Sequence, residues 1–306
     1  MKNITIEEIS QTFSLEVLSG HDQLHRIIKK SKVRRPGLEF MDKFDFIATE
    51  HVQILGKNEV NYLHTLTFEE CKLRIANIVQ YAPPCIIITS QQEEPLGLIK
   101  YCSEEKIPVL RTRDSTSELS AKLDAYVVKA MAPEIAIHGV CVNVSGMGIL
   151  LRGKSGVGKS ETAHTMIGRG HRLVADDVVV LKKLSPQTLL GTHDENSKEF
   201  LALRSIGLLN VVRLYGRAAF QDETRIALDI ELTKWKENDL NNELEQEMKF
   251  VEYMDVQIPH IQIQLQPGRD IAGLIEAAAN NWYLKQQGYS AVEEFMKRIE
   301  SDIPDS

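Results

Sequence analysis

Several features that would narrow the function are missing from this sequence. It has four cysteines in 306 residues (Cys71, Cys85, Cys102 and Cys141), with no Cys-x-x-Cys pair and no histidine at zinc-ligand spacing. Neither a disulfide framework nor a zinc site is therefore expected, and we expect buried free thiols, as in a reducing cytosol. No apolar run approaches the roughly 20 residues needed to span a bilayer, and acidic residues interrupt the start of the chain before a signal-peptide core can form. These absences predict a cytoplasmic protein with no membrane segment.

A surplus of basic charge is missing as well. The chain has 36 lysines and arginines against 43 aspartates and glutamates, a formal net charge of −7, whereas general binders of nucleic acid or anionic membranes carry a basic excess. The basic run at residues 26–35 (RIIKKSKVRR) has no interleaved aromatic residues, so we interpret it as the exposed face of a helix. No nucleic-acid partner is expected.

The overall composition, 43% hydrophobic and 26% charged residues, is that of a globular chain, and 306 residues leave room for two domains.

The hydrophobic pattern changes at Pro133. Before it, strands are predicted at 85–90 and 107–110, and helices at 96–104 and from the capping box at 115–118 to about residue 130. This alternation predicts a small α/β domain over residues 1–132. After Pro133 we expect strands at 140–144, 149–151, 178–181, 200–203 and 260–265. Helices are expected after the glycine-rich loop described next and over 234–249, 271–285 and 290–300.

Residues 153–160 (GKSGVGKS) fit the complete phosphate-loop pattern G-x-x-x-x-G-K-[S/T]. Glycines let the backbone N–H groups wrap closely around phosphates. Lys159 supplies a cation to the β- and γ-phosphates, and the Ser160 hydroxyl can bind Mg²⁺. A strand-like run precedes the loop and a helix-like run follows it, so the positive end of the helix would face the same anion. We expect a nucleotide site formed by Gly153, Lys154, Ser155, Gly156, Val157, Gly158, Lys159 and Ser160.

Two adjacent aspartates, Asp176 and Asp177, follow the next predicted strand. A carboxylate at a strand end beside such a loop commonly binds Mg²⁺ directly or through water, which gives one of them a role. The other is either a cap or turn residue, or the base that takes the proton of an incoming hydroxyl, as in kinases that phosphorylate alcohols. Local sequence leaves both interpretations open. Mutual repulsion raises the proton affinity of one carboxylate and Mg²⁺ lowers it, so such a group could accept a proton in one direction and donate it in the other.

The block SGVGKSETA (155–163) followed by RGHRLVADD (169–177) is similar to the HPr kinase/phosphorylase family. IHG (137–139), LALRSIGLLNVV (201–212) and PGR (267–269) also match, as do RPGL (35–38) and VQILGK (52–57) in the N-terminal half. The resemblance covers nearly the whole chain. It implies an N-terminal α/β domain (1–132) and a phosphate-loop catalytic domain (133–306) similar to phosphoenolpyruvate carboxykinase, assembled as a homohexamer.

The resemblance also implies a reaction. Members of the family use ATP and Mg²⁺ to phosphorylate a serine of HPr, the phosphocarrier protein of the sugar phosphotransferase system, and remove that phosphate by phosphorolysis to pyrophosphate, which regulates carbohydrate uptake and catabolite repression. Carried over by position, His138, Lys159 and Asp177 are catalytic, with Asp177 the base for phosphorylation and the acid for the reverse reaction. Ser160 and Asp176 bind the metal. The phosphorolysis region comprises Gln264, Leu265, Gln266, Pro267, Gly268 and Arg269. Without the resemblance, His138 would be interpreted as a structural histidine.

Three positions depart from the family pattern. Ala202 stands where the family has a magnesium-binding glutamate, and alanine cannot coordinate a cation. The family's catalytic arginine aligns with Glu243 or its neighbours, and a cation in such a role can be worth about 10³-fold in rate. The segment Gln264–Gln266 replaces a run that contains an arginine in the family. We therefore expect nucleotide binding to be intact and phosphorolysis to be the activity most reduced.

Two alternatives to an HPr kinase stay open. A non-catalytic, nucleotide-binding regulatory or scaffold paralogue is favoured by Ala202 and the missing arginine, whereas the intact His138, Lys159 and Asp177 favour an enzyme. A kinase with another acceptor, a protein or a small alcohol, is the third hypothesis, because phosphate-loop folds act on many acceptors.

Overall fold

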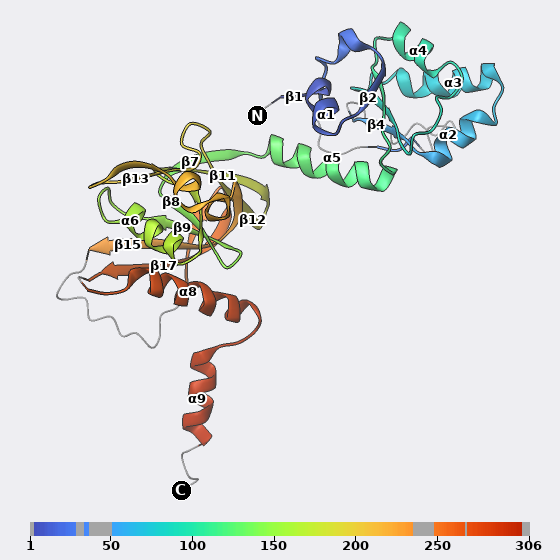
Figure 1. Ribbon diagram of the computed structural model, residues 1–306. Helices are drawn as coiled ribbons and strands as arrows, with labels where there is room; N and C mark the ends of the chain where they lie inside the picture. The colour runs from blue at the N-terminus through green and yellow to red at the C-terminus, as the bar shows by residue number, and fades with distance from the viewer. Residues whose placement is uncertain (1–2, 29–33, 37–50, 235–247, 267, 302–306) are drawn as a thin grey trace. The chain divides into compact units, whose positions relative to one another are not determined.

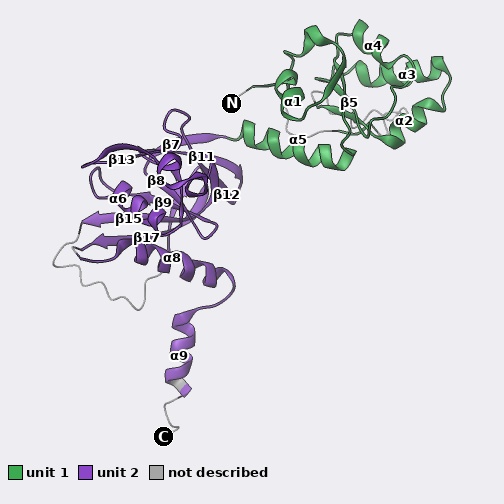
Figure 2. Ribbon diagram, in the orientation of Figure 1, with its two compact units in different colours: residues 1–132 green, residues 133–306 purple. Residues whose placement is uncertain are grey.

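A computed structural model describes residues 3–28, 34–36, 51–234, 248–266 and 268–301. The chain divides into two compact units, residues 1–132 and 133–306, coloured green and purple in Figure 2. Both units combine helices with a sheet, which confirms the predicted α/β class. All four cysteines are buried and unpaired, as expected. Among the described residues no helix is long and apolar enough to cross a membrane.

The first unit is built on a four-stranded sheet in the order β2-β6-β5-β4, in which β4, β5 and β6 are parallel and β2 is antiparallel to β6. The strands are β2 (Glu16–Ser19), β4 (Gln53–Leu55), β5 (Ile86–Ile88) and β6 (Val109–Arg111). Alternate residues face opposite sides. Ile86 and Ile88 pack with α2 (Lys57–His64), α3 (Phe68–Val79) and α4 (Leu98–Glu104). Ile87 packs with α1 (Ile6–Thr12) and α5 (Thr116–Met131).

The prediction for the basic run at residues 26–35 is wrong where the structure describes it. Ile27–Ile28 form strand β3, paired antiparallel with β1 (Ile4–Thr5), because neighbouring β-branched residues favour a strand. The Arg26 guanidinium donates hydrogen bonds to four backbone carbonyls, those of Ala82, Pro83, Pro84 and Lys106. Its charge therefore holds a loop in place and does not belong to an exposed helix face. Residues 29–33 lie outside the described part.

The second unit contains a large mixed sheet in the order β10-β8-β9-β15-β12-β11-β7, of which all strands but β10 are labelled in Figure 1. Strand β17 adds to β15, and β16 adds to β17. The strands are β7 (Glu134–His138), β8 (Val140–Val144), β9 (Met147–Arg152), β10 (Arg172–Ala175), β11 (Val178–Ser185), β12 (Thr188–His193), β15 (Glu223–Lys234), β16 (Lys249–Tyr253) and β17 (Val256–Leu265). A separate hairpin joins β13 (Phe200–Leu203) to β14 (Gly207–Asn210).

Helices α6 (Lys159–Gly168) and α8 (Ile271–Gln286) share one face of this sheet. Ile149 and Leu151 of β9 pack with them, while Leu150 joins a second core on the other face. Among the described residues this unit also has the helices α7 (Val211–Tyr215) and α9 (Ala291–Ser301) and a 3-10 helix at Arg217–Ala219. Because β9 and β10 are both antiparallel to β8, they run in the same direction and end at the same edge of the sheet. That edge carries the loop that follows β9 and the two aspartates that follow β10.

Most elements predicted for this unit are present, and one expectation falls largely outside the described residues. The predicted strands at 140–144, 149–151, 178–181, 200–203 and 260–265 correspond to β8, β9, β11, β13 and β17, and the last two predicted helices to α8 and α9. The helix expected over 234–249 falls on residues 235–247, which the structure does not describe. Its two ends are strand residues, since Lys234 closes β15 and Lys249 opens β16.

Candidate active site

The phosphate loop joins the end of β9 to the start of α6. Three of its glycines have positive φ angles, 141° at Gly153, 75° at Gly156 and 108° at Gly158, which residues with a side chain rarely adopt. Val157 is 9% exposed and packs into the core shared with α6 and α8, so it fastens the loop to the sheet. Gly158 precedes α6 without a side-chain cap, which leaves the first N–H groups of the helix available to an anion.

Lys159 is held against the same loop. Its Nζ donates to the carbonyl oxygens of Gly153, at 3.0 Å, and Lys154, at 3.4 Å. These contacts keep the ammonium group inside the ring of backbone that would surround the phosphates. The hydroxyl of the next residue, Ser160, donates a hydrogen bond to Oδ1 of Asp176 at 2.8 Å.

Asp176 is the inward-facing member of the aspartate pair. It is 4% exposed, and its second oxygen, Oδ2, accepts a hydrogen bond from the backbone N–H of Ala202 at 2.8 Å. Burial raises the pKa of this carboxyl, and the hydrogen bonds from Ala202 and Ser160 oppose that rise. A hydroxyl beside a carboxylate fits Mg²⁺, which takes oxygen ligands and keeps most of its coordination for water and phosphates. The described part of the chain contains no group of three or more histidine, cysteine, aspartate or glutamate side chains that could hold a metal ion.

Asp177 is the outward-facing member. Its φ of 66° is uncommon for a residue with a side chain and reverses the side-chain direction between the buried end of β10 and the start of β11. Its side chain is 82% exposed, and Oδ1 lies 3.7 Å from Nδ1 of His138, itself 88% exposed. Two backbone contacts fix the arrangement: His138 is paired with Val178, and the N–H of Gly139 donates to the carbonyl of Asp177 at 3.0 Å. The structure thus brings together a histidine and an aspartate that are 39 positions apart in the sequence.

Arg204 contacts the phosphate loop, although no role was predicted for it beyond its place in a segment that matches the family. It follows β13, and a β-carbon at Gly156 would collide with its guanidinium group. The β13–β14 hairpin therefore places the Ala202 N–H next to Asp176 and the Arg204 guanidinium next to the phosphate loop. The matching run LALRSIG was the signal that could have identified Arg204 as a site residue.

The segment expected to serve phosphorolysis lies partly beside the loop. Gln264 and Leu265 close β17, and a β-carbon at Gly158 would lie 3.9 Å from the Leu265 side chain. The chain then turns, with the N–H of Arg269 donating to the carbonyl of Gln266 at 3.2 Å and Gly268 at a φ of 82°. Pro267 and Glu243 lie outside the described residues.

Comparison with known proteins identifies the family. The family model described as "HPr Serine kinase C-terminal domain" matches residues 129–299, and "HPr Serine kinase N terminus" matches residues 4–127. The chain belongs to the HPr serine kinase family. It is 62% identical over 300 residues to "Putative HPr kinase/phosphorylase 2" of Oceanobacillus iheyensis, covering 98% of both chains. It is 38% identical over 305 residues to "HPr kinase/phosphorylase" of a Geobacillus species, covering 100% of this chain and 98% of the relative.

A solved structure is also similar to this member of the HPr serine kinase family. It is titled "Structure of the Hpr(Ser) kinase/phosphatase from Coxiella burnetii" and is 30% identical in sequence. The similarity covers 53% of this chain and 98% of that chain, with a TM-score of 0.48. The family assignment comes from the sequence matches, which extend over both units.

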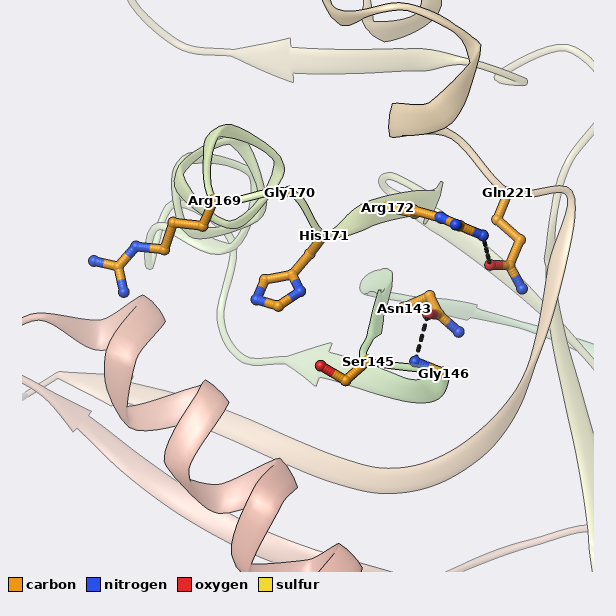
Figure 3. A pocket seen from close by; sticks show the side chains of 8 residues that line it. All are labelled: Asn143, Ser145, Gly146, Arg169, Gly170, His171, Arg172 and Gln221. Atoms are coloured by element: carbon orange, nitrogen blue, oxygen red, sulfur yellow. Dashed lines mark hydrogen bonds between the residues drawn. The ribbon is translucent and has the colours of Figure 1, made fainter.

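A polar hollow of about 690 Å³ is lined in part by the residues that follow the C-terminal end of α6 (Figure 3). It is lined by Asn143, Ser145, Gly146, Arg169, Gly170, His171, Arg172 and Gln221. Arg169 donates to Asp270 at 2.8 Å and to Glu276 at 3.1 Å, and His171 lies 2.8 Å from Glu276. The contact with His171 is the main reason that the pKa of Glu276 is lowered. These carboxylates belong to the N-cap and first turns of α8, so the contacts join α6 to α8 and take no part in the nucleotide site.

Removing the Arg204 cation is expected to slow phosphoryl transfer. Arg204→Gln keeps a polar side chain but takes a positive charge away from the phosphate loop, where charge accumulates in the transition state, so we expect the transfer rate to fall by about 10²-fold. The measurement is the initial rate of transfer from labelled ATP. Arg213→Gln, an exposed residue of α7, is the matched control and should retain the rate. Equal rates for wild type and Arg204→Gln would contradict a role for Arg204 at the loop.

Proposed function

We propose that this protein is an ATP- and Mg²⁺-dependent kinase that transfers the γ-phosphoryl group to a serine of the phosphocarrier protein HPr. The observation that supports the proposal best is the exposed Asp177–His138 pair, which lies at the same sheet edge as the phosphate loop. An enzyme that only hydrolysed ATP would need to orient a water molecule, whereas a protein acceptor needs a base that it can reach from solution. Asp177 meets that need because its side chain is 82% exposed.

In the proposed reaction the chain's own groups have separate tasks. The loop amides and Lys159 hold the terminal phosphates. Asp177 takes the proton from the serine hydroxyl, the serine oxygen bonds to the γ-phosphorus, and the bond from that phosphorus to the β-phosphate oxygen breaks to leave ADP. Ser160 and Asp176 would hold Mg²⁺, which when bound neutralises phosphate charge. Arg204, whose guanidinium lies beside Gly156, would stabilise the charge of the transferring group.

We also propose the setting that the family resemblance implies. The protein would act in the cytoplasm as a homohexamer and, through seryl-phosphorylated HPr, regulate carbohydrate uptake and catabolite repression. The reverse reaction, phosphorolysis of seryl-phosphorylated HPr to pyrophosphate, would be weak. Gln264 and Gln266 carry no charge where a second anion, inorganic phosphate, must be bound beside the loop.

A nucleotide-binding scaffold without turnover is the second candidate function. It is favoured by Ala202, whose backbone contacts Asp176 but whose side chain offers no oxygen to a cation. The remaining site favours catalysis, since a scaffold has no use for an exposed aspartate beside a histidine. The two functions predict the same nucleotide affinity and differ in whether phosphate leaves the nucleotide.

The test uses purified protein, γ-labelled ATP, Mg²⁺ and HPr, with an HPr variant that has alanine at the accepting serine as the control. The proposal predicts acid-stable label on HPr and none on the control. Calorimetry measures ATP binding in parallel. Tight ATP binding with no labelled HPr would support the scaffold, and label on the control protein would point to another acceptor residue.

Restoring a carboxylate at position 202 is expected to strengthen Mg²⁺ binding. In Ala202→Glu the backbone N–H still donates to Asp176, and the new side chain adds an oxygen ligand next to it, so the Mg²⁺ concentration for half-maximal transfer should fall about 10-fold. Ala202→Gln is the matched control, of equal size without the charge. A titration with Mg²⁺ at saturating ATP measures both. An unchanged Mg²⁺ concentration for half-maximal transfer in Ala202→Glu would contradict the proposal that Mg²⁺ binds beside Asp176 and residue 202. The same shift in Ala202→Gln would also contradict it.

A further inference from the structure

A fully buried carboxylate lies beside the residue that precedes the phosphate loop. Asp229, in β15, is 0% exposed, and both of its oxygens are occupied. Arg152, the last residue of β9, donates from Nε to Oδ2 at 2.6 Å and from NH2 to Oδ1 at 2.7 Å. The Tyr253 hydroxyl donates to Oδ2 at 2.8 Å, and Nδ1 of His260 lies 2.6 Å from Oδ1. Three strands, β9, β16 and β17, therefore each contribute a side chain to one carboxylate of β15.

The contacts of this network constrain the Arg152 side chain. A buried carboxylate is tolerated only when it is paired and hydrogen-bonded, and the two parallel bonds from Arg152 fix the plane of the guanidinium group. The hydrogen bonds that Arg152 donates to Asp229 raise the pKa of the arginine, so it stays charged. Burial, followed by the charge of Asp229, raises the pKa of Tyr253, so the phenol stays protonated. The guanidinium also lies 5.9 Å from the centre of the Tyr253 ring, a cation–π distance.

Arg152 lies next to two parts of the candidate active site. Gly153, the first residue of the phosphate loop, follows it directly. A β-carbon at Gly139 would lie 3.7 Å from Cγ of Arg152, so the stem of the arginine packs against the backbone that follows His138. The N–H of Gly139 in turn donates to the carbonyl of Asp177. Holding Arg152 therefore holds the start of the loop relative to the turn that carries the base.

The network also reaches the third part of the site. His260 pairs with Asp229 across the parallel strands β15 and β17. Five residues later β17 ends at Leu265, whose side chain lies beside Gly158 of the loop. Asp229 thus links, through side chains and strands, the phosphate loop, the His138–Asp177 pair and the segment that follows β17.

We propose that Asp229 is a positioning residue for phosphoryl transfer, which sets the separation between the phosphate loop and the His138–Asp177 pair by holding Arg152. The inference depends on the proposed function for its kinetic readout. A buried ion pair is often no more stabilising than apolar side chains of similar size, and its best-attested benefit is a unique local arrangement. Transfer rates are sensitive to such arrangements, since a misplacement of about 1 Å can cost about 10²-fold.

Asp229→Asn tests the proposal, because it keeps the shape of the side chain and removes its charge. We expect kcat for transfer to HPr to fall by between about 10-fold and 10²-fold, while KM for ATP changes less than about 3-fold, since the loop amides and Lys159 remain. Tyr253→Phe and His260→Gln each remove one contact without leaving the arginine unpaired, and each should lower kcat by about 3-fold with the same unchanged KM. An unchanged kcat in all three variants would overturn the proposal.

A double variant separates positioning from stability. Arg152→Gln combined with Asp229→Asn replaces the ion pair by two amides, which leaves no buried charge unpaired and should restore the melting temperature lost in Asp229→Asn. Because an amide pair cannot reproduce the two parallel bonds of the guanidinium group, kcat should stay low. Recovery of kcat together with the melting temperature would show that Asp229 acts only through stability and would overturn the proposal.

Hydrogen–deuterium exchange tests the positioning role of Asp229 independently of phosphoryl transfer. In Asp229→Asn we expect faster amide exchange at residues 136–140 and 152–158, with the exchange of α8 unchanged. Equal exchange in both proteins, or a uniform rise over the whole second unit, would overturn the proposal. If the wild-type protein transfers no phosphate to HPr, the proposed function fails, and this exchange pattern still tests the position of Asp229 in the network.

Discussion

Replacing Lys159 by methionine is expected to lower the rate of phosphoryl transfer by about 10³-fold and to weaken ATP binding. In the structure the ammonium group is already held inside the loop by the carbonyls of Gly153 and Lys154, so it need only exchange these contacts for phosphate oxygens. Methionine keeps the apolar stem and removes the charge that offsets the γ-phosphate. The measurements are the initial rate of labelled transfer to HPr and the ATP affinity by calorimetry.

Lys285→Met provides the matched control for this prediction. Lys285 lies in the last turn of α8 and undergoes the same change of charge in a helix of the same unit. Its rate should stay within about 2-fold of wild type, as surface substitutions away from a site rarely matter. A Lys159→Met protein that keeps more than a tenth of the wild-type rate would show that the loop does not hold the transferred phosphate.

Asp177→Asn has the second large expected effect. The amide cannot accept the serine proton, so we expect the transfer rate to fall by between about 10²-fold and 10⁴-fold, the range for loss of a general base. ATP affinity should stay unchanged, because Asp177 contacts no part of the loop recorded in the structure. Asparagine is suited to this test, since it tolerates the positive φ of 66° at this position as well as aspartate does.

Asp255→Asn is an unusually close control. Asp255 is also an aspartate with a positive φ, 61°, and its side chain is 88% exposed, but it lies in the turn between β16 and β17 and pairs with Lys183. The same chemical change in the same backbone region should leave the rate unaltered. If Asp177→Asn and Asp255→Asn transfer phosphate equally well, Asp177 is a turn residue only, which is the other interpretation that the sequence left open.

The parts of the site that sequence predicts well are local. The phosphate loop is a continuous pattern whose glycine positions follow from backbone geometry alone, and the structure gives those glycines the positive φ angles that the pattern requires. The two aspartates could be recognised as a pair in the sequence. Local sequence did not predict that the Asp176 side chain is buried while that of Asp177 is exposed. Burial of Asp176 against Ser160 and Ala202 depends on the position of the β13–β14 hairpin, which local sequence does not specify.

The parts that local sequence could not predict depend on contacts between distant strands. His138 was named as a site residue through the family resemblance alone, and it reaches Asp177 through the pairing of β7 with β11. Asp229 was not predicted at all, and it gains its partners from three strands. Strand β15 itself carried a readable signal, the alternation of Ile226, Leu228, Ile230 and Leu232, although no strand was predicted there. The prediction of an exposed helix face at residues 26–35 failed for a different reason. The Arg26 guanidinium donates hydrogen bonds to backbone carbonyls of a distant loop, and a charge pattern does not reveal such contacts.

The most direct measurement is a single turnover with the protein in excess over γ-labelled ATP, in the presence of Mg²⁺ and HPr. The account predicts that label lost from ATP appears one-for-one on a serine of HPr. ATP that stays intact while bound, or label that is released as inorganic phosphate with HPr unmodified, would contradict it.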